Sequence, residues 1–174
     1  MASSAHFLTL SQRIVQLEQH LLPPFNPGGN YTPQEQDLIR SYCLLTHAEI
    51  ESYIEDIVLD ISTRAMNRWN TNKDNITPII FHLTFNCKTK AVPYSMTNIS
   101  FQELQKTIGS NHGIKESNIT NLLNPIGFEM DRTLLNTLTT FGESRGRIAH
   151  SSFRTQQLLD PSTEKPLLVQ FIRS

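Results

Sequence analysis

Cysteine is scarce in this sequence. The 174 residues include two cysteines, Cys43 and Cys87. Neither belongs to a CxxC pair or to a Cys/His spacing that is typical of zinc sites. We therefore expect no disulfide, with Cys43 buried on a helix and Cys87 in a loop or strand. The sequence also offers no cluster of metal ligands, so we expect neither a metal nor another cofactor.

An excess of basic residues and long apolar runs are missing as well. The formal net charge is -1 and the pI is about 6.6. Proteins that bind nucleic acid through a broad basic face are usually strongly basic, so any RNA contact must use a local basic cluster. No stretch approaches the roughly 18–20 apolar residues that cross a bilayer. Residues 1–10 lack the features of a signal peptide. These absences predict a cytoplasmic protein without a membrane partner.

What the chain does contain is the composition of one soluble domain. Hydrophobic residues make up 38% of it and charged residues 18%, which is typical of a globular protein and not of a disordered one. Its length allows one domain with a core and is too short for two comfortable ones. We predict a single domain over residues 1–174, with the core motifs at about 34–152 and a C-terminal tail at 153–174.

A long helix is the clearest element in the pattern. Thr32, Pro33 and Glu35 occupy the N-cap, first helical and capping-box positions of a helix start. No further proline and no glycine follows until after Trp69, so we predict a helix from Pro33 to about Trp69. An apolar seam with alternating steps of four and three would pack along another helix. It consists of Cys43, His47, Ile50, Ile54, Ile57 and Ile61.

Shorter helices are predicted on both sides of this helix. Apolar residues at steps of three and four predict a first helix that ends at Leu22, before two prolines. Residues 70–100 lose the pattern and are interpreted as an irregular insertion. Helices are expected to begin again at Ser100, Ser117 and Asp131, and Gly142 is expected to end or kink the last of them. The predicted fold class is an all-α helical bundle with one long central helix.

The pattern of Arg, four to six residues, then His occurs at Arg13/His20, Arg40/His47 and Arg145/His150. Composition alone predicts it about once by chance. The first two pairs lie in predicted helices, where seven positions bring side chains to nearly the same face as ordinary neighbours. The third pair differs because Gly142 and Gly146 flank the arginine, and glycine tolerates unusual backbone conformations. We expect Arg145 to lie in a turn ahead of the helix that carries His150, so that both point into one cleft.

The surrounding residues resemble a known superfamily. The segment 141–150, FGESRGRIAH, is similar to the terminal motif of HEPN domains, in which Arg is followed after four to six residues by His. The segment 44–54, LLTHAEIESYI, resembles the central helix of the RiboL-PSP-HEPN branch, with its mid-helix acidic residue at Glu51. Residues 111–127 fit that branch too. Gly146 departs from the Asn of many members, and Ser152 stands where toxin-type members can carry a Tyr.

The resemblance implies a HEPN-type bundle and a metal-independent endoribonuclease that cleaves RNA through its 2′-OH. Such cleavage needs a group that titrates near neutrality, as histidine does, and a cation for the phosphate, as arginine provides. Arg145 and His150 would be catalytic, and Glu51 would orient Arg145. Arg147 and Ser144 would contact substrate. The resemblance further implies a homodimer, working as a prokaryotic toxin or defence effector with an antitoxin or other protein partner.

Simpler interpretations stay open beside these. Arg145 and His150 can serve capping or interface roles, and Arg147 can be an exposed helix residue. Glu51 can be a solvated carboxylate, as is expected of Glu49 and Glu55, while Glu143 and Ser144 are typical turn or cap residues. His47, His82 and His112 are expected to be packed or surface histidines. The alternative function is a non-catalytic HEPN dimer that binds RNA, a nucleotide or a protein.

Overall fold

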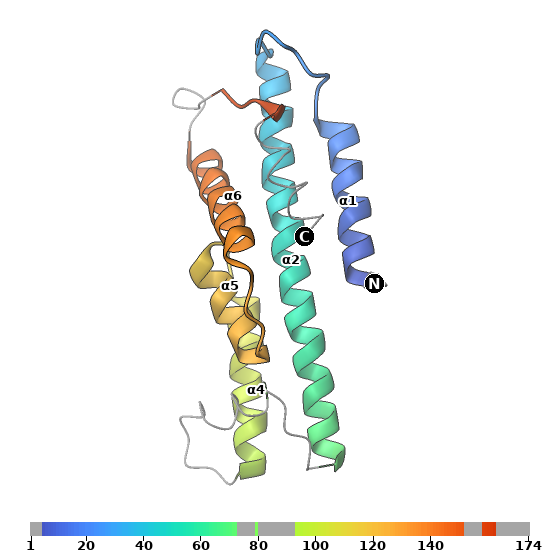
Figure 1. Ribbon diagram of the computed structural model, residues 1–174, viewed down its shortest axis with the longest axis vertical. Coiled ribbons are helices and arrows are strands. Elements are labelled where there is room, and N and C mark those ends of the chain that lie inside the picture. Colours follow the sequence, from blue (N-terminus) through green and yellow to red (C-terminus); the bar gives the residue numbers. More distant parts are fainter. Residues whose placement is uncertain (1–4, 73–78, 80–92, 152–157, 163–174) are drawn as a thin grey trace. The chain divides into compact units, whose positions relative to one another are not determined.

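The described part of the chain consists mainly of helices (Figure 1). The computed structural model describes residues 5–72, 79, 93–151 and 158–162. Within these ranges the helices are α1 (Ala5–Leu21), α2 (Pro33–Asn72), α4 (Pro93–Gly109), α5 (Glu116–Leu123), the 3-10 helix η1 (Asn124–Ile126) and α6 (Arg132–His150). The predicted all-α fold with one long helix is confirmed, since α2 has 40 residues. No helix among the described residues is long and apolar enough to cross a membrane.

The start of α2 is the capping box that the sequence predicts. The Thr32 amide donates to Glu35 Oε2 at 2.8 Å, and the Glu35 amide donates to Thr32 Oγ1 at 3.2 Å. These two bonds satisfy backbone donors that no helical carbonyl can reach. The bonds from Thr32 lower the pKa of the Glu35 carboxyl, because they favour its charged form. Pro33 occupies the first helical position, where its missing N–H costs nothing.

The contacts divide the chain into two compact units. The first unit contains α1, α2 as far as Tyr53, residues 113–116, and the described residues from Asp131 onward. The second contains α2 from Ile54, α4, most of α5, and η1. All the candidate site residues, from Glu51 to His150, belong to the first unit.

In the first unit α1 lies beside α2 in the antiparallel sense (Figure 1). As the residue numbers increase along α1, the residue numbers of their contact partners on α2 decrease. They are an edge-to-face pair of Phe7 and Tyr53 with ring centroids 6.4 Å apart, an ion pair of Arg13 and Glu49 at 3.0 Å, and a contact of Tyr42 with Glu18 at 3.5 Å. Burial beside the Glu18 carboxylate raises the pKa of the Tyr42 hydroxyl. Residues Leu10, Ile14 and Leu17 give α1 its buried side.

The buried side of α2 follows a longer period than the predicted seam. Cys43, His47, Ile50 and Ile54 are buried as predicted. Ile57 and Ile61 are only half-buried, while Val58 and Ser62 are fully buried in their place. A straight helix of about 3.6 residues per turn drifts by roughly 20° per heptad from a 3.5-residue repeat. The predicted seam therefore no longer coincides with the buried side in the second half of α2.

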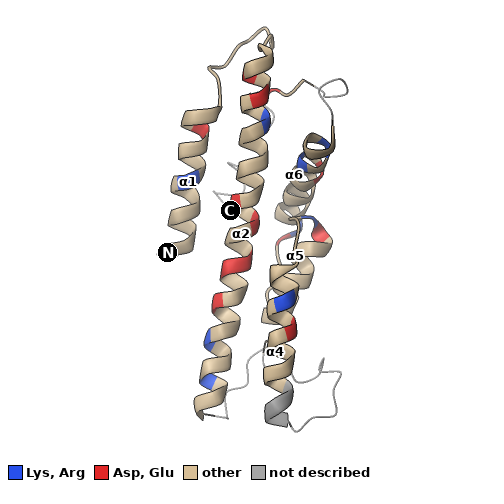
Figure 2. Ribbon diagram, turned by 180° about the vertical axis from the view of Figure 1, so that it is seen from behind, with Lys and Arg blue, Asp and Glu red and all other residues tan. Residues whose placement is uncertain are grey.

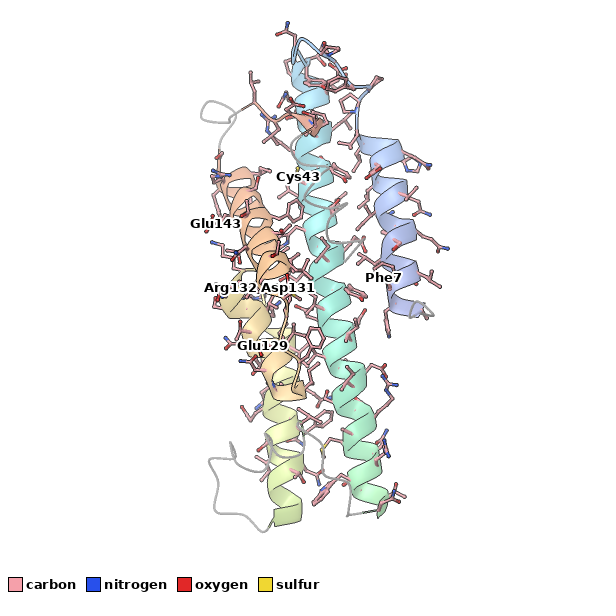
Figure 3. All side chains as sticks on the ribbon, viewed as in Figure 1. Phe7, Cys43, Glu129, Asp131, Arg132 and Glu143 are labelled. Carbon is pink, nitrogen blue, oxygen red and sulfur yellow. The ribbon has the colours of Figure 1, made fainter. Side chains whose placement is uncertain are left out.

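Helix α6 begins at a side-chain cap that the sequence predicts. Asp131 Oδ1 accepts from the amides of Thr133 at 2.9 Å and Leu134 at 3.2 Å, which fixes the N-terminus (Figure 3). Arg132, the next residue, pairs with Glu116. The Glu116 amide also donates to Thr139 Oγ1 at 3.0 Å. These bonds attach the segment 113–116 to the first half of α6.

The predicted turn around Arg145 is wrong, because α6 is continuous from Arg132 to His150. Gly142 lies inside the helix, where a Cβ would stand 3.2 Å from Lys115 Cγ and 3.5 Å from Ile114 Cγ1. A glycine at this position lets the segment 113–116 approach α6 closely. A Cβ on Gly146 would meet nothing within 4 Å. Glycine permits a turn but does not require one.

In the second unit, polar side chains join α2 to the elements after it. Trp69 Nε1 donates to Thr97 Oγ1 on α4 at 3.1 Å. Asn111 Nδ2 donates to Glu55 Oε1 at 2.8 Å, and Asn118 Nδ2 donates to Asn111 Oδ1 at 2.9 Å. Glu55, expected to be solvated, is therefore half-buried and hydrogen-bonded.

Helix α4 begins at Pro93, so the predicted start at Ser100 and the predicted irregular character of residues 93–100 are wrong. Thr97 and Ser100 are buried, and an apolar periodicity cannot reveal a buried side made of polar residues. The rest of the predicted insertion, at 73–78 and 80–92, lies outside the described residues, as do Cys87, His82, Ser152 and residues 163–174. Cys43 is buried on α2, as predicted.

One segment of the C-terminal tail is attached to α2. The buried Gln36 side chain donates to the Leu159 carbonyl at 3.0 Å and accepts from the Leu159 amide at 2.9 Å. Pro161, two residues later, is also buried. Nothing in the sequence pattern indicated this contact.

The two glycines of α6 predict opposite responses to the same substitution. Gly146→Ala should raise the free energy of unfolding by roughly 0.5–1 kcal/mol, because alanine is favoured over glycine inside a helix and the space is open. Gly142→Ala should gain less or lose stability, since Lys115 must give way. Urea unfolding of the two variants beside the parent measures this. An equal gain in both would contradict the close packing at Gly142.

Candidate functional site

Arg145 and His150 lie on the last turns of α6 but do not share a face. Arg145 is half-buried, whereas His150 is exposed and ends the helix. Five positions along a continuous helix separate two side chains by about 140°. Within one copy of the chain these two side chains therefore point in different directions. The single cleft expected from a turn at Gly142 and Gly146 is not formed in this way.

The charge of Arg145 acts on a buried histidine of α2, His47. Its side chain is 2% exposed, and its ring lies 6.0 Å from the Phe141 ring on α6, with a 32° angle between the planes. Burial and, second to it, the Arg145 charge lower the pKa of His47 from 6.5 to about 4. Both causes disfavour a second positive charge. His47 is therefore neutral at physiological pH.

Glu51 lies on the same side of α2, one turn after His47. Its Oε2 atom is 3.6 Å from His47 Nδ1, and its side chain is 16% exposed. That separation is within ion-pair range, but the low pKa of His47 means that the carboxylate faces a neutral ring near pH 7. No ion pair between Glu51 and Arg145 is present among the described residues. An orienting role of Glu51 towards Arg145 stays a prediction.

The two predicted substrate contacts differ in accessibility. Arg147 is exposed in the last turn of α6, while Ser144 is buried. A contact between the Ser144 hydroxyl and RNA would require movement around it. Ser144 and the exposed Glu143 lie inside the helix, so the interpretation of both as turn or cap residues is wrong (Figure 3).

The basic residues at the end of α6 also have a structural explanation. Arg147 and His150 lie in the last turn, where cations interact favourably with the negative end of the helix dipole. Ser151 Oγ donates to the Arg147 carbonyl at 2.6 Å and satisfies one of the last acceptors. In Figure 2 the arginine positions of α6 and the acidic positions along α2 can be followed on the ribbons.

The other Arg/His pairs of the sequence form no comparable cluster. Arg13 pairs with Glu49, which was expected to be solvated, and Arg40 pairs with Asp37 at 3.0 Å. His20 Nδ1 lies 2.7 Å from the Gln16 carbonyl in an ordinary helical contact. Among the residues that the structure describes, no group of three or more His, Cys, Asp or Glu could hold a metal ion.

Sequence reasoning underestimated His47. His47 was expected to be a packed or surface histidine, and the side chain is indeed buried. Its position beside Arg145, however, comes from α6, almost a hundred residues later in the chain. The available signal was the spacing of His47 and Glu51, four positions apart on one helix. That spacing alone cannot identify a partner on another helix.

A comparison with protein-family models matches residues 9–167 of the chain to the family described as RiboL-PSP-HEPN. The chain belongs to the RiboL-PSP-HEPN family. The matched span contains every candidate site residue, and the predicted resemblance and HEPN-type fold are confirmed. Family membership supports a nuclease or RNA-binding module in general. No curated protein and no solved structure was found to match the chain.

The buried histidine of this HEPN protein predicts acid sensitivity. As the pH falls below 6.5, the unfolded chain protonates His47, but the folded protein does so only near pH 4. The stability that the neutral ring contributes is complete above the unfolded pKa and is lost through this window. The loss is up to about 3 kcal/mol, from 1.36 kcal/mol per pKa unit.

Urea unfolding at about pH 7 and about pH 4.5 measures this loss. His47→Phe should reduce the difference between the two pH values, because the ring that titrates is gone. His112→Phe removes an exposed histidine and should leave the difference unchanged. An unchanged pH dependence in His47→Phe would count against a neutral buried His47.

Proposed function

We propose that this RiboL-PSP-HEPN protein is a metal-independent endoribonuclease in which Arg145 and His150 act on the scissile phosphate. The observation that carries the proposal is the exposure of the two motif residues at the end of α6. His150 is exposed to a substrate, while Arg145 is half-buried and its charge acts on His47 of α2. An exposed proton-transfer group and a supported cation are the two parts that such a reaction needs.

The proposed chemistry uses the nucleophile that RNA itself contains. His150 takes the proton of the 2′-OH as its oxygen attacks phosphorus. The bond from phosphorus to the 5′-oxygen then breaks, and that oxygen takes a proton from water, which recovers it from the protonated His150. The guanidinium of Arg145 neutralises the charge that develops on the phosphate oxygens. The products are a 2′,3′-cyclic phosphate and a 5′-hydroxyl end, and no metal takes part.

A second copy of the chain completes the proposed site. One chain supplies one motif, and its Arg145 and His150 are about 140° apart around α6, so a single copy cannot direct both at one phosphate. Two copies related by a two-fold axis can place the histidine of one beside the arginine of the other. HEPN domains commonly dimerise and bind RNA. A toxin or defence role with an antitoxin partner is part of the same proposal.

The alternative is a HEPN dimer that binds RNA, a nucleotide or a protein without cleaving. Two observations favour it. The net charge of -1 leaves little general attraction for RNA, and Gly146 provides no side chain beside Arg145, where a Cβ would face open space. Under this alternative, Arg147 and Arg145 would contact phosphate without chemistry.

Cleavage of single-stranded RNA decides between the two functions. The purified protein should cut RNA equally well in EDTA and in magnesium, and 2′-deoxy substitution at the cut site should block cleavage. His150→Ala should lower the rate by about 10²–10⁴-fold, the usual contribution of general acid–base catalysis. Arg145→Ala should lose activity through lost charge stabilisation.

The exposed His112 provides the control, since His112→Ala should cleave like the parent. Circular dichroism and light scattering should show that all three variants keep their helices and their assembly. A His150→Ala protein as active as the parent would overturn the nuclease proposal. RNA that is bound but never cut would favour the binding module.

Mixing two inactive variants tests the shared site. The parent should be a dimer by light scattering at micromolar concentration. Co-expressed Arg145→Ala and His150→Ala chains carrying different tags should yield a heterodimer that regains activity. One of its two sites then pairs an intact arginine with an intact histidine from the other chain. A heterodimer as inactive as each homodimer, or a monomeric parent, would contradict a site built from both copies.

A further inference from the structure

The basic side chains described in the first unit differ in whether a carboxylate pairs with them. Those with a partner within ion-pair range are Arg13, Arg40 and Arg132. Those without one among the described residues are Lys115, Arg145 and Arg147. All of the latter belong to α6 or to the segment 113–116 that packs on it. Positive charge without an acidic partner is therefore gathered on α6 and beside it.

Lys115 differs from the two arginines because it reaches α6 from another part of the chain. A Cβ added to Gly142 would stand 3.2 Å from Lys115 Cγ and 3.5 Å from the Lys115 amide nitrogen. The backbone and the first carbons of Lys115 thus lie directly against α6. The residue is nevertheless exposed, as is usual for a lysine whose stem is packed while its charged end stays in water. Lys115 therefore presents its ammonium to solvent from the surface of α6.

The contact at Gly142 lies on the side of α6 between the two motif residues. An α-helix turns by about 100° per residue, so Gly142 lies about 60° from Arg145 around the axis. In the same sense, Gly146 lies about 100° and His150 about 140° from the arginine. Gly146 follows Gly142 by about one turn, and a Cβ there would meet nothing within 4 Å. This side of α6 is therefore open next to the lysine stem.

The carboxylates closest to this contact do not occupy the ammonium of Lys115. Glu116, the next residue, pairs with Arg132 at the start of α6. Glu143 points about 100° away from Gly142 around the helix axis. Among the described residues, neither carboxylate forms an ion pair with Lys115. The ammonium therefore keeps its donors for an anion that comes from outside the chain.

We propose that Lys115 is an RNA-binding residue, which contacts a backbone phosphate next to the one at Arg145 and His150. A lysine ammonium is a compact charge with three rotatable donors, so it binds phosphate without reading the base. It supplies part of the local basic cluster that a chain with a net charge of -1 needs in order to attract RNA. The assignment rests on the proposed function in one respect, namely that the ligand at the motif is RNA. It applies equally to an enzyme and to a binding module.

Lys115→Met is the informative substitution, because methionine keeps an unbranched stem over Gly142 and removes the charge. Arg68→Gln is the matched control. Arg68 is an exposed cation of the second unit that also has no carboxylate partner among the described residues. Both substitutions remove one positive charge. Circular dichroism and urea unfolding should show that both variants keep the helices and the stability of the parent.

Binding of a labelled single-stranded RNA is measured in the His150→Ala background, in which the RNA stays intact, over a range of salt concentrations. Each phosphate contact of a single strand adds about 0.7 to the slope of log affinity against log salt. Lys115→Met should therefore weaken binding several-fold at low salt and reduce the slope by about 0.7. Arg68→Gln should keep the slope of the parent. An unchanged slope in Lys115→Met, or an equal change in Arg68→Gln, would overturn the proposal.

Cleavage kinetics separate this role from catalysis. A contact that is made equally with the substrate and with the transition state affects binding and not the chemical step. Lys115→Met should raise KM several-fold and leave kcat close to that of the parent, and Lys115→Arg should restore most of the KM. A Lys115→Met protein that loses kcat at an unchanged KM would contradict a binding role.

The outcomes distinguish this assignment from the proposed nuclease. If the parent binds RNA without cutting it and Lys115→Met has the smaller slope, the nuclease fails and the phosphate contact stands. If the parent cuts RNA and Lys115→Met matches it in binding and in KM, the contact fails and the nuclease stands. A parent that binds no RNA would overturn the assignment. So would a Lys115→Met protein that is monomeric by light scattering beside a dimeric parent, because the lysine would then contact the second copy.

Discussion

The packing of α6 against the first half of α2 is the interaction on which the candidate site depends. It buries Phe141 beside His47 and brings the Arg145 charge to a ring that has already lost its solvent. Burial and the neighbouring cation act in the same direction, so His47 stays neutral. A neutral histidine can then coexist with an arginine and a glutamate in one small space. If α6 were displaced, Arg145 would lose its buried neighbour and His47 would regain an ordinary titration.

The close approach at Gly142 keeps α6 in this place. The segment 113–116 lies against the glycine and is attached to α6 by the bond from Glu116 to Thr139 and by the ion pair of Glu116 with Arg132. Exposed ion pairs contribute little, so the packing matters more than the charge. The functional end of α6 is thereby supported at positions about two to five helical turns before its histidine.

The continuity of α6 sets what a single copy can do. Arg145 is half-buried and His150 is exposed, because a regular helix rotates by about 100° per residue and points the two side chains in different directions. Because this rotation separates the two side chains within one copy, a two-fold assembly is the simplest arrangement that brings an arginine and a histidine from different copies together. It also explains why the motif can look complete in sequence and still be incomplete in one chain.

Local rules made much of this structure predictable from the sequence. The capping box of Thr32 and Glu35, the cap at Asp131, the long helix without glycine or proline, and the resemblance around residues 141–150 all depend on residues within a few positions of one another. Predictions from neighbouring residues failed where the role of a residue depends on a part of the chain that is distant in the sequence. Gly142 suggested a break because its partner, Lys115, is not adjacent in the chain, and α4 was missed over residues 93–100 because its buried residues there include Thr97 and Ser100.

The sequence by itself determined the helices and the family, since hydrogen bonds and caps act between near neighbours. Only the tertiary structure decided that the charge of Arg145 acts on a buried His47 and that His150 is exposed, because burial and charge act through space and depend on how α6 packs on α2.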